Sequence, residues 1–321
     1  NVLTVDTRAI AIADARASTA RWRERRTLGP LDGVPFLVKD EFDVEGTATT
    51  LGSRCESTAP KSADATPVAR LRAAGAICLG KTVLTEWGMS PLGANPHQAM
   101  PHNAHQGERA PGGSSTGSAV GVALGISPIA CAGDGGGSIR IPASLNGVYG
   151  IKPTFGRVSR AGDGFKGSVA HCGPIAASPA DLALFLDAVA SEHDPDDELT
   201  AWAPPPPAGG FGALLGAGVK GLRIGVDEDE WRDASEPVAR SSARQSPTIC
   251  QRPSRRESPA SLQSAPASSS SRSAPAMAGG KSFSPIAPSG DRWRRGDWTS
   301  YSPHTLRSFS YGEVDRSRAP T

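Results

Sequence analysis

The stretch SAVGVALGISPIACAGDGGGS (Ser118–Ser138) decides the fold. Its small residues as far as Gly125 predict a helix packed closely against a sheet, and the apolar run Ile126–Ala132 predicts a short buried strand. The chain then turns sharply through Gly133–Ser138. Because a helix leads directly into a buried strand and a glycine turn, this stretch is typical of a layered α/β protein.

A second strand is predicted upstream, in GVPFLVKDEFDVEG (Gly33–Gly46). The apolar run Gly33–Lys39 leads directly into the charged cluster Lys39-Asp40-Glu41. A further helix is expected at 67–74, closed by Gly75, with another buried strand at 76–80. Since α/β proteins place their sites where strands end, the cluster after Lys39 is a candidate site.

The remaining elements continue the alternation. We predict a helix at 8–28 that Gly29-Pro30 ends, and a long polar loop from Pro91 to Gly113. A helix at 179–189 has Ser178 placed as its N-cap, and 222–226 predicts a last strand. The pattern as a whole predicts an α/β fold.

Composition excludes several classes of protein. The 321 residues carry 34 basic and 32 acidic side chains, a net charge of +2, which offers no electrostatic footprint for nucleic acid or an anionic membrane. Five cysteines without a CxxC pair argue against a disulfide framework and a zinc site, and favour a reducing, cytoplasmic compartment. Neither a membrane span nor a secretory leader is visible, although a leader could precede Asn1, which is not a methionine.

The character of the sequence changes after about Arg240. About half of residues 241–321 are Ser, Arg or Pro, and large aliphatic side chains nearly vanish. We therefore divide the chain into a folded core, residues 1–240, and a low-complexity tail, residues 241–321, that is disordered or derives from a shifted reading frame. The frameshift is the favoured interpretation, because the mixture of Arg, Ser and Pro with occasional Trp suits GC-rich coding sequence read out of frame.

Ser138 closes the glycine turn and is the first candidate for chemistry. Gly135, Gly136 and Gly137 leave backbone N–H groups unhindered and able to converge on an oxyanion. An ordinary flexible turn is the alternative interpretation. A phosphate-binding loop fits less well, because Gly-Lys-Ser/Thr should follow such a loop and Gly137 is followed directly by Ser138.

A formal G-x-S-x-G surrounds Ser115 and suggests a second candidate nucleophile, with His171 or His193 as its base. The context argues against it, since a nucleophile elbow must follow a strand and this motif follows a polar loop. Lys39 is the third candidate: a solvated strand end in the usual case, and a proton acceptor if it is buried. Three loop histidines lack a rigid frame and nearby carboxylates, so no metal site is expected: His97, His102 and His105.

Together these segments resemble the amidase signature family. The resemblance covers about residues 1–240, and its core is GGSSTGSAVGVALGISPIACAGDGGGSIRIPASLNGVYGIKP (Gly112–Pro153). The blocks Gly33–Gly46, GKT around Lys81 and CGPIAASPADLALFLDAV (Cys172–Val189) are also similar to family blocks. The resemblance implies an α/β/α sandwich with a central mixed sheet, here truncated at both ends and followed by the disordered tail.

The resemblance also implies the site. Ser138 would be the nucleophile, Ser114 a bridging serine held by a cis peptide bond, and Lys39 the base, in a Ser-Ser-Lys triad that needs no cofactor. The oxyanion hole would consist of backbone N–H groups of Gly135, Gly136, Gly137 and Ser138. Supporting roles would fall to Ser115, Asp134 and Arg140.

Departures from the family pattern bear on activity. Thr116 stands where the family usually has glycine, and Gly135 where it often has threonine. Because family members continue beyond the matched region and have helices before it, we expect this chain to expose apolar surface and to be weakly active or inactive.

The expected function is hydrolysis of a small-molecule amide, with no nucleic-acid or membrane partner and an open oligomeric state. One alternative is the ammonia-generating A-type subunit of a tRNA amidotransferase. Another is a noncatalytic chain whose tail binds partners through its arginines and serines.

Overall fold

The structure is a computed structural model that describes residues 1–165, 168–190, 193–213, 215–218, 220–221, 224–226 and 249–251. The chain divides into two units, Asn1–Arg252 and Pro253–Thr321. All described residues belong to the first unit. The predicted boundary at residue 240, and the predicted tail apart from 249–251, lie outside the described residues.

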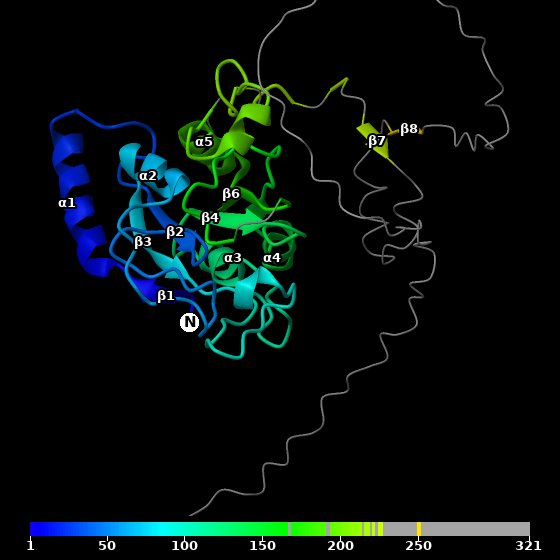
Figure 1. The fold of residues 1–321 in the computed structure, drawn as a ribbon. Helices are drawn as coiled ribbons and strands as arrows, with labels where there is room; N and C mark the ends of the chain where they lie inside the picture. The colour runs from blue at the N-terminus through cyan, green and yellow to red at the C-terminus, as the bar shows by residue number, and fades with distance from the viewer. Residues whose placement is uncertain are drawn as a thin grey trace, which may run out of the picture. The chain divides into compact units, whose positions relative to one another are not determined.

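A six-stranded mixed sheet forms the centre of the first unit (Figure 1). In spatial order it consists of β1 (Leu3–Asp6), β3 (Ile77–Thr82), β2 (Pro35–Lys39), β4 (Ile129–Asp134), β6 (His171–Ala176) and β5 (Tyr149–Gly150). β2 runs parallel to both β3 and β4, and the other pairs are antiparallel. The predicted mixed sheet is therefore confirmed, with parallel strands at its centre.

Helices cover both faces of this sheet, because its strands are apolar on both sides. On β2, Phe36 and Val38 pack against α2 (Thr66–Ala73) and α5 (Pro179–Val189), whereas Leu37 packs on the opposite face against α3 (Thr116–Ala123). α4 (Arg140–Leu145) lies on the same face as α3. Figure 1 shows the two pairs of helices on opposite sides of the strands, as an α/β/α sandwich requires.

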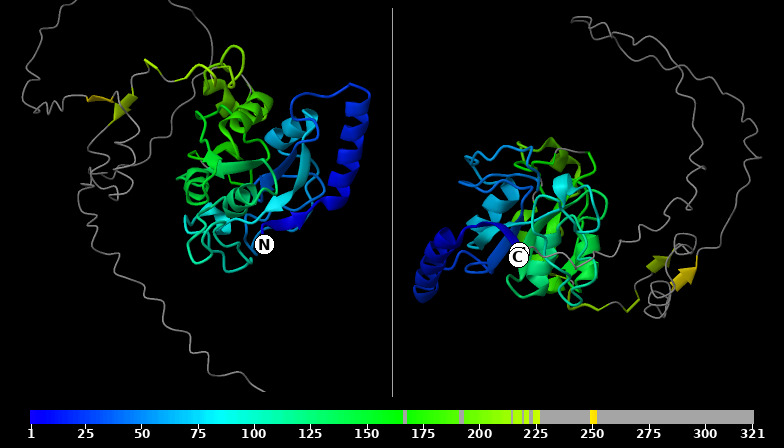
Figure 2. Two further views of the ribbon diagram at one scale, coloured as in Figure 1. Left: turned by 180° about the vertical axis from the view of Figure 1, so that it is seen from behind. Right: turned by 90° about the horizontal axis from the view of Figure 1, so that it is seen from below.

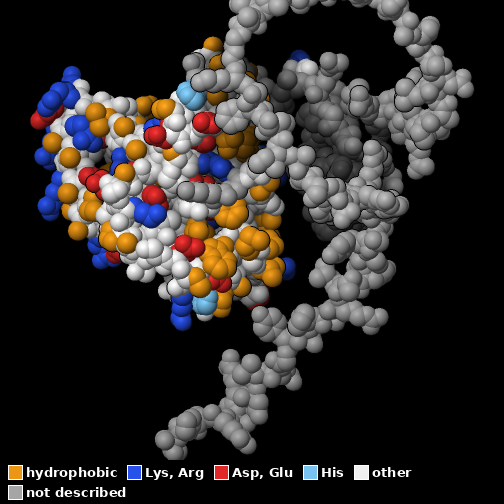
Figure 3. All heavy atoms as spheres, in the orientation of Figure 1, with side chains coloured by type: hydrophobic (Ala, Val, Ile, Leu, Met, Phe, Trp, Pro, Cys, Tyr) orange, Lys and Arg blue, Asp and Glu red, His pale blue; other side chains and the backbone are white. Residues whose placement is uncertain are grey.

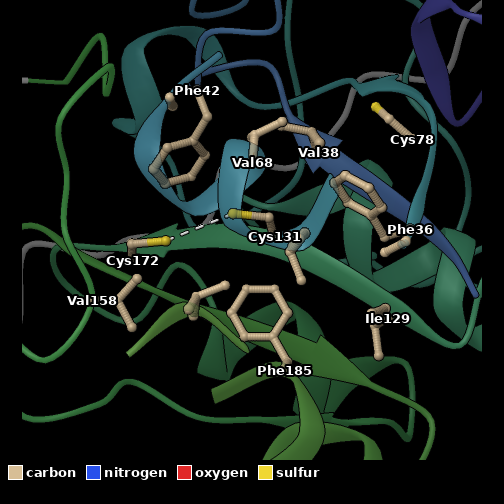
Figure 4. Packing of buried hydrophobic residues seen from close by; sticks show 14 of the residues in the cluster. Phe36, Val38, Phe42, Val68, Cys78, Ile129, Cys131, Val158, Cys172 and Phe185 are labelled. Atoms are coloured by element: carbon tan, nitrogen blue, oxygen red, sulfur yellow. Dashed lines mark hydrogen bonds between the residues drawn. The ribbon is translucent and has the colours of Figure 1, made fainter. Parts of the chain in front are cut away.

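The larger core cluster lies between the sheet and the pair α2 and α5 (Figure 4). Phe36, Phe42 and Phe185 are fully buried there. The thiols of Cys131 on β4 and Cys172 on β6 lie 3.6 Å apart between them, and burial raises the pKa of Cys172. This apolar layer contacts β4, which lies next to β2, and β6, the strand beyond it.

The first helix is shorter than predicted. α1 spans Arg8–Arg23 and lies beside β3 at the outer side of the first unit (Figure 2). It ends because Arg25 adopts a left-handed conformation (φ 55°), while the N–H groups of Arg25 and Arg26 donate to the carbonyls of Trp22 and Arg21. This is a Schellman motif with arginine where glycine is usual, so the helix stops before Gly29.

Several elements were missed. β1 is only four residues long, β6 contains Gly173 and Pro174, and α4 contains Pro142, so none shows a clear period. Two short 3₁₀ helices, Glu86–Gly88 and Glu198–Trp202, were also not predicted.

A separate pair of parallel strands, β7 (Ile224–Val226) and β8 (Ile249–Gln251), includes the predicted last strand.

Apolar side chains remain exposed near the edge strand β5. Leu145, Tyr149 and Ile151 are all exposed there, and Figure 3 shows hydrophobic side chains gathered on the surface near α4. Among the described residues, no helix has the length and apolar character needed to cross a membrane.

The N-cap of α5 provides a test of the fold. Ser178 Oγ accepts a hydrogen bond from the N–H of Asp181, at 3.1 Å. We predict that Ser178→Ala lowers the free energy of unfolding by about 1 kcal/mol. Urea denaturation measures this, and Ser62→Ala at an exposed serine is the control, expected to change it by less than about 0.5 kcal/mol. Equal effects of the two substitutions would contradict the capping role.

Candidate active site

The candidate site lies at the edge of the sheet where two parallel strands end. Lys39 is the last residue of β2 and Asp134 the last of β4, its parallel neighbour. Because parallel strands end at the same edge, these two side chains are brought together. They line a cavity of about 350 Å³, with Glu41, Trp87, Gly88, Met89, Ser114, Gly133, Gly135, Gly136, Ser138, Phe165, Val169 and Ala170.

Other cavities are larger but lack the candidate residues. One of about 440 Å³ lies between α1 and the adjacent strands, and one of about 490 Å³ lies near Lys61 and Asp197. Neither is lined by a serine, lysine or glycine from the predicted site. We therefore take the cavity at the ends of β2 and β4 as the candidate active site.

Lys39 is buried at the base of this cavity, with 1% of its surface exposed. Its Nζ lies 2.9 Å from Ser114 Oγ, 3.3 Å from the carbonyl oxygen of Gly133 and 2.7 Å from Glu41 Oε2. The alternative of a solvated strand end is thereby excluded. A buried amine in hydrogen-bond contact with a serine hydroxyl has the geometry for proton exchange.

The loop before α3 presents Ser114 to this amine. The peptide bond between Gly113 and Ser114 is cis, as the family resemblance implies. The next residue, Ser115, joins the loop to the glycine turn: its N–H donates to the carbonyl of Ser138 at 3.1 Å, and its Oγ donates to the carbonyl of Gly133 at 3.2 Å. The two segments are therefore held together by Ser115.

The buried carboxylate of Asp134 holds the glycine turn in place. Its carboxylate accepts hydrogen bonds from the N–H of Gly137 (2.7 Å) and Ile139 (3.0 Å), and forms a two-pronged pair with the guanidinium of Arg140. Burial alone would raise the pKa of Asp134, but the hydrogen bonds from Arg140, Ile139 and Gly137 outweigh it and hold the pKa at about 2. The turn is thus built around an ionised carboxylate.

The predicted oxyanion donors differ from one another. The N–H of Gly137 is engaged by Asp134, so it points away from a substrate oxygen. In the described part of the chain, the N–H groups of Gly135, Gly136 and Ser138 have no hydrogen-bond partner, and neither does Ser138 Oγ. These three N–H groups and the hydroxyl remain available to a substrate.

The G-x-S-x-G interpretation does not fit the geometry. Ser115 is fully buried and is absent from the cavity lining, and its hydroxyl is used by Gly133. His171 contacts Lys152 Nζ (3.2 Å) and the carbonyl of Val169 (2.8 Å), and His193 lies near Thr200. Neither histidine has a contact with a candidate serine in the described residues.

The loop histidines are also separate from one another. His97 lies 3.2 Å from Glu86, His102 contacts the carbonyl of Gly107, and His105 contacts the carbonyl of Asn146. Within the ranges that the structure describes, no group of three or more His, Cys, Asp or Glu side chains is arranged to hold a metal ion.

A second buried lysine near the site has a different environment. Lys81 Nζ lies 2.6 Å from Asp40 Oδ1 and donates to the carbonyl of Ala48 and to Thr49 Oγ1, both at 2.7 Å. Burial lowers the pKa of Lys81, although the charge of Asp40 opposes it. Lys81 does not line the cavity, so it is not placed to contact a substrate there. Its contacts stabilise the loop after β2.

Two features of the cavity were missed in the sequence. One is the contact between Glu41 and Lys39: the charged cluster was noted as a candidate site, but not the tight turn that returns Glu41 to Lys39. The other is an apolar wall formed by Trp87, Met89, Phe165 and Val169. Because these residues come from a short 3₁₀ helix and an irregular segment, no periodic pattern marked them.

This chain is similar in sequence to proteins that are already known. The Amidase family model matches residues 3–276. The chain is 40% identical over 235 residues to the A subunit of glutamyl-tRNA(Gln) amidotransferase of Chloroflexus aurantiacus, covering 73% of this chain and 47% of that protein. It is 41% identical over 246 residues to AtzE, the 1-carboxybiuret hydrolase subunit of Pseudomonas sp., covering 75% and 52%. The chain thus spans about half the length of these relatives.

Solved structures agree with the sequence comparison. Peptide amidase from Stenotrophomonas maltophilia is 34% identical with a TM-score of 0.69, over 78% of this chain and 53% of that one. A structure from a vestigial protein complex, described as revealing the origins of an s-triazine catabolic enzyme, is 39% identical with a TM-score of 0.73, over 79% and 56%. The structural similarity therefore extends over nearly four fifths of this chain.

The Asp134 network predicts a pH-dependent stability. A carboxylate whose pKa is about 2 in the folded chain, against about 3.8 when unfolded, stabilises the fold above pH 4 by about 2 kcal/mol. This contribution is lost as the pH falls from about 4 to 2. We expect Asp134→Asn to be less stable than wild type by about that amount at pH 7, and the difference to disappear near pH 2.

Urea denaturation at a series of pH values measures this difference. Asp196→Asn, at an exposed carboxylate, is the control and should shift the free energy of unfolding by less than about 0.5 kcal/mol. A difference between wild type and Asp134→Asn that stays constant from pH 7 to pH 2 would show that the charge of Asp134 is not the stabilising feature.

Proposed function

This chain belongs to the amidase family, and we propose that it carries the catalytic core of a hydrolase that cleaves a carboxylic amide through an acyl-enzyme on Ser138. The observation that carries the proposal is the 2.9 Å contact between Lys39 Nζ and Ser114 Oγ, in the cavity that Ser138 also lines. A buried amine, a bridging hydroxyl and an unbonded serine hydroxyl are the groups that acyl transfer needs when no histidine is present.

In the proposed acylation, Ser138 Oγ attacks the carbonyl carbon of the amide. Its proton passes to Ser114 Oγ as the proton of Ser114 passes to the neutral amine of Lys39, so Lys39 becomes an ammonium group. The carbonyl oxygen gains negative charge and accepts hydrogen bonds from the unbonded N–H groups of Gly135, Gly136 and Ser138. Gly137 contributes by holding the turn to Asp134 rather than by contacting the oxyanion.

The second half of the reaction returns the proton. As the carbon–nitrogen bond breaks, Lys39 passes its proton back through Ser114 to the departing nitrogen, which leaves as ammonia or an amine. A water molecule then attacks the ester on Ser138 by the same relay, and the acid is released. Ser115, Asp134 and Arg140 keep the two loops in register during both halves.

The substrate is proposed to be a small amide with an apolar acyl group. Trp87, Met89, Phe165 and Val169 support this, because they form an apolar wall beside Ser138. We also propose a cytoplasmic location, since the cysteines in the described residues, Cys55, Cys78, Cys131 and Cys172, are unpaired.

A second candidate is an ammonia-generating subunit. It is supported by the 40% identity to the A subunit of glutamyl-tRNA(Gln) amidotransferase. Stable copurification with tRNA and a second subunit, together with ammonia release from glutamine, would favour this function over a free-standing amidase. The third interpretation, a tail that binds partners, falls on residues outside those that the structure describes.

Fluorophosphonate labelling tests the proposed nucleophile. We expect the chain to label slowly but detectably, because the serine, lysine and N–H donors are in place. Ser138→Ala should abolish labelling, whereas Ser115→Ala should retain it and Ser62→Ala should match wild type. Labelling lost only in Ser115→Ala would sink the assignment of Ser138.

Substitution of Lys39 tests the proposed base. Lys39→Met keeps the side-chain volume but removes the proton acceptor, and we expect the labelling rate of Ser138 to fall about a hundredfold or more. Lys61→Met, at a partly exposed lysine outside the cavity, is the matched control and should label at the wild-type rate. A folded Lys39→Met chain that labels as fast as the control would mean that another group accepts the proton.

A further inference from the structure

Glu41 lines the cavity beside Lys39, although it lies only two residues further along the chain. The N–H groups of Glu41 and Phe42 both donate to the carbonyl of Lys39, at 2.7 and 3.1 Å, so the chain turns back immediately after β2. The turn brings Glu41 Oε2 to 2.7 Å from Lys39 Nζ. Both side chains are almost entirely buried, so this ion pair is shielded from water and salt.

Gly133 makes room for this carboxylate. A Cβ atom on Gly133 would overlap Glu41 Oε1, and its carbonyl oxygen also contacts Lys39 Nζ at 3.3 Å. Glycine at position 133 therefore leaves the space that the Lys39–Glu41 ion pair needs. Any larger residue would force the carboxylate away from the amine.

The contacts of Lys39 suit both of its protonation states. As an ammonium group it has three N–H donors for Ser114 Oγ, the carbonyl of Gly133 and Glu41 Oε2. As a neutral amine it has two donors, for Gly133 and Glu41, and a lone pair that faces Ser114. Glu41 and Gly133 thus keep the amine aimed at Ser114 while a proton arrives or leaves.

A second carboxyl group lies behind Glu41. Asp163 is buried in a segment that pairs with the turn: it bridges Phe42, and the N–H of Gly164 donates to the carbonyl of Glu41 at 2.7 Å. Burial, with the negative charge of Glu41 next, raises the pKa of Asp163 well above its usual range. Asp163 is therefore harder to ionise than an exposed carboxyl group, and Glu41 is the carboxyl group that contacts Lys39.

The other charged or titratable groups around Glu41 do not replace it. Asp134, from β4, is neutralised by Arg140. Burial raises the pKa of the Cys172 thiol, from β6, which stays neutral, and the guanidinium of Arg160 donates to the carbonyl of Ala170. Glu41 is the carboxylate in direct contact with the amine.

We propose that Glu41 is a positioning residue that aims Lys39 at Ser114 and stabilises its ammonium form. The proposal rests on the proposed function of Lys39 as the base. Without this adjacent negative charge, the ammonium form of Lys39 is less favourable relative to the neutral amine. The same charge stabilises the ammonium group that forms during acylation, when the proton leaves Ser138.

The test compares Glu41→Gln with wild type in two measurements. In the first, the ¹³Cε signal of Lys39, assigned with Lys39→Met, is followed by NMR as a function of pH. In the second, the rate of fluorophosphonate labelling of Ser138 is measured over the same pH range. We expect the midpoints of both curves to move to lower pH by about one unit or more in Glu41→Gln.

Two matched variants define the result. Glu45→Gln makes the same substitution at an exposed residue four positions along, and Asp163→Asn removes the neighbouring carboxyl group. Both should keep the wild-type midpoint. A Glu41→Gln midpoint equal to wild type would overturn the proposal, and so would a shift seen in Asp163→Asn but not in Glu41→Gln.

The proposal stays testable if Glu41→Gln does not fold. Gly133→Ala displaces the carboxylate without removing it, and should also lower the midpoint. If Ser138 labels in no variant, the proposed function fails, while the NMR titration still decides the role of Glu41.

Discussion

The burial of Lys39 at the end of β2 is the constraint on which the site depends. An amine without water needs a partner for each of its hydrogens, and Ser114, Gly133 and Glu41 supply them. Gly133 is itself constrained, because it has no space for a side chain. The three segments that meet around this one amine are therefore held in a single arrangement.

The glycine turn that carries Ser138 is also held by the hydrogen bonds of one buried charged group. Asp134 is buried at the end of β4 and takes up the N–H groups of Gly137 and Ile139 together with Arg140. Because one carboxylate fixes both ends of the turn, the N–H groups between them can remain unbonded without the turn collapsing. Preorganised donors of this kind are what stabilisation of an oxyanion requires.

Sequence alone predicted those parts of the fold that have a strong local pattern. β2, β4 and α5 were found because apolar runs and the Ser178 cap mark them, whereas β1, β6 and α4 are short or contain Pro and Gly. Ser138 and Lys39 were candidates from the local sequence and Ser114 from the family resemblance, and the structure places all three at one cavity. The engaged N–H of Gly137 and the return of Glu41 to Lys39 depend on side chains that meet only in the folded chain, so no pattern could show them.

The most direct test of the account is to locate the modified residue by tandem mass spectrometry of the probe-treated chain. Trypsin releases residues 110–140 as one peptide that contains Ser114, Ser115 and Ser138. The account predicts that the added mass stays with the C-terminal fragment Ser138–Arg140. Added mass on the fragment that contains Ser114 and Ser115, with residues 138–140 unmodified, would contradict it.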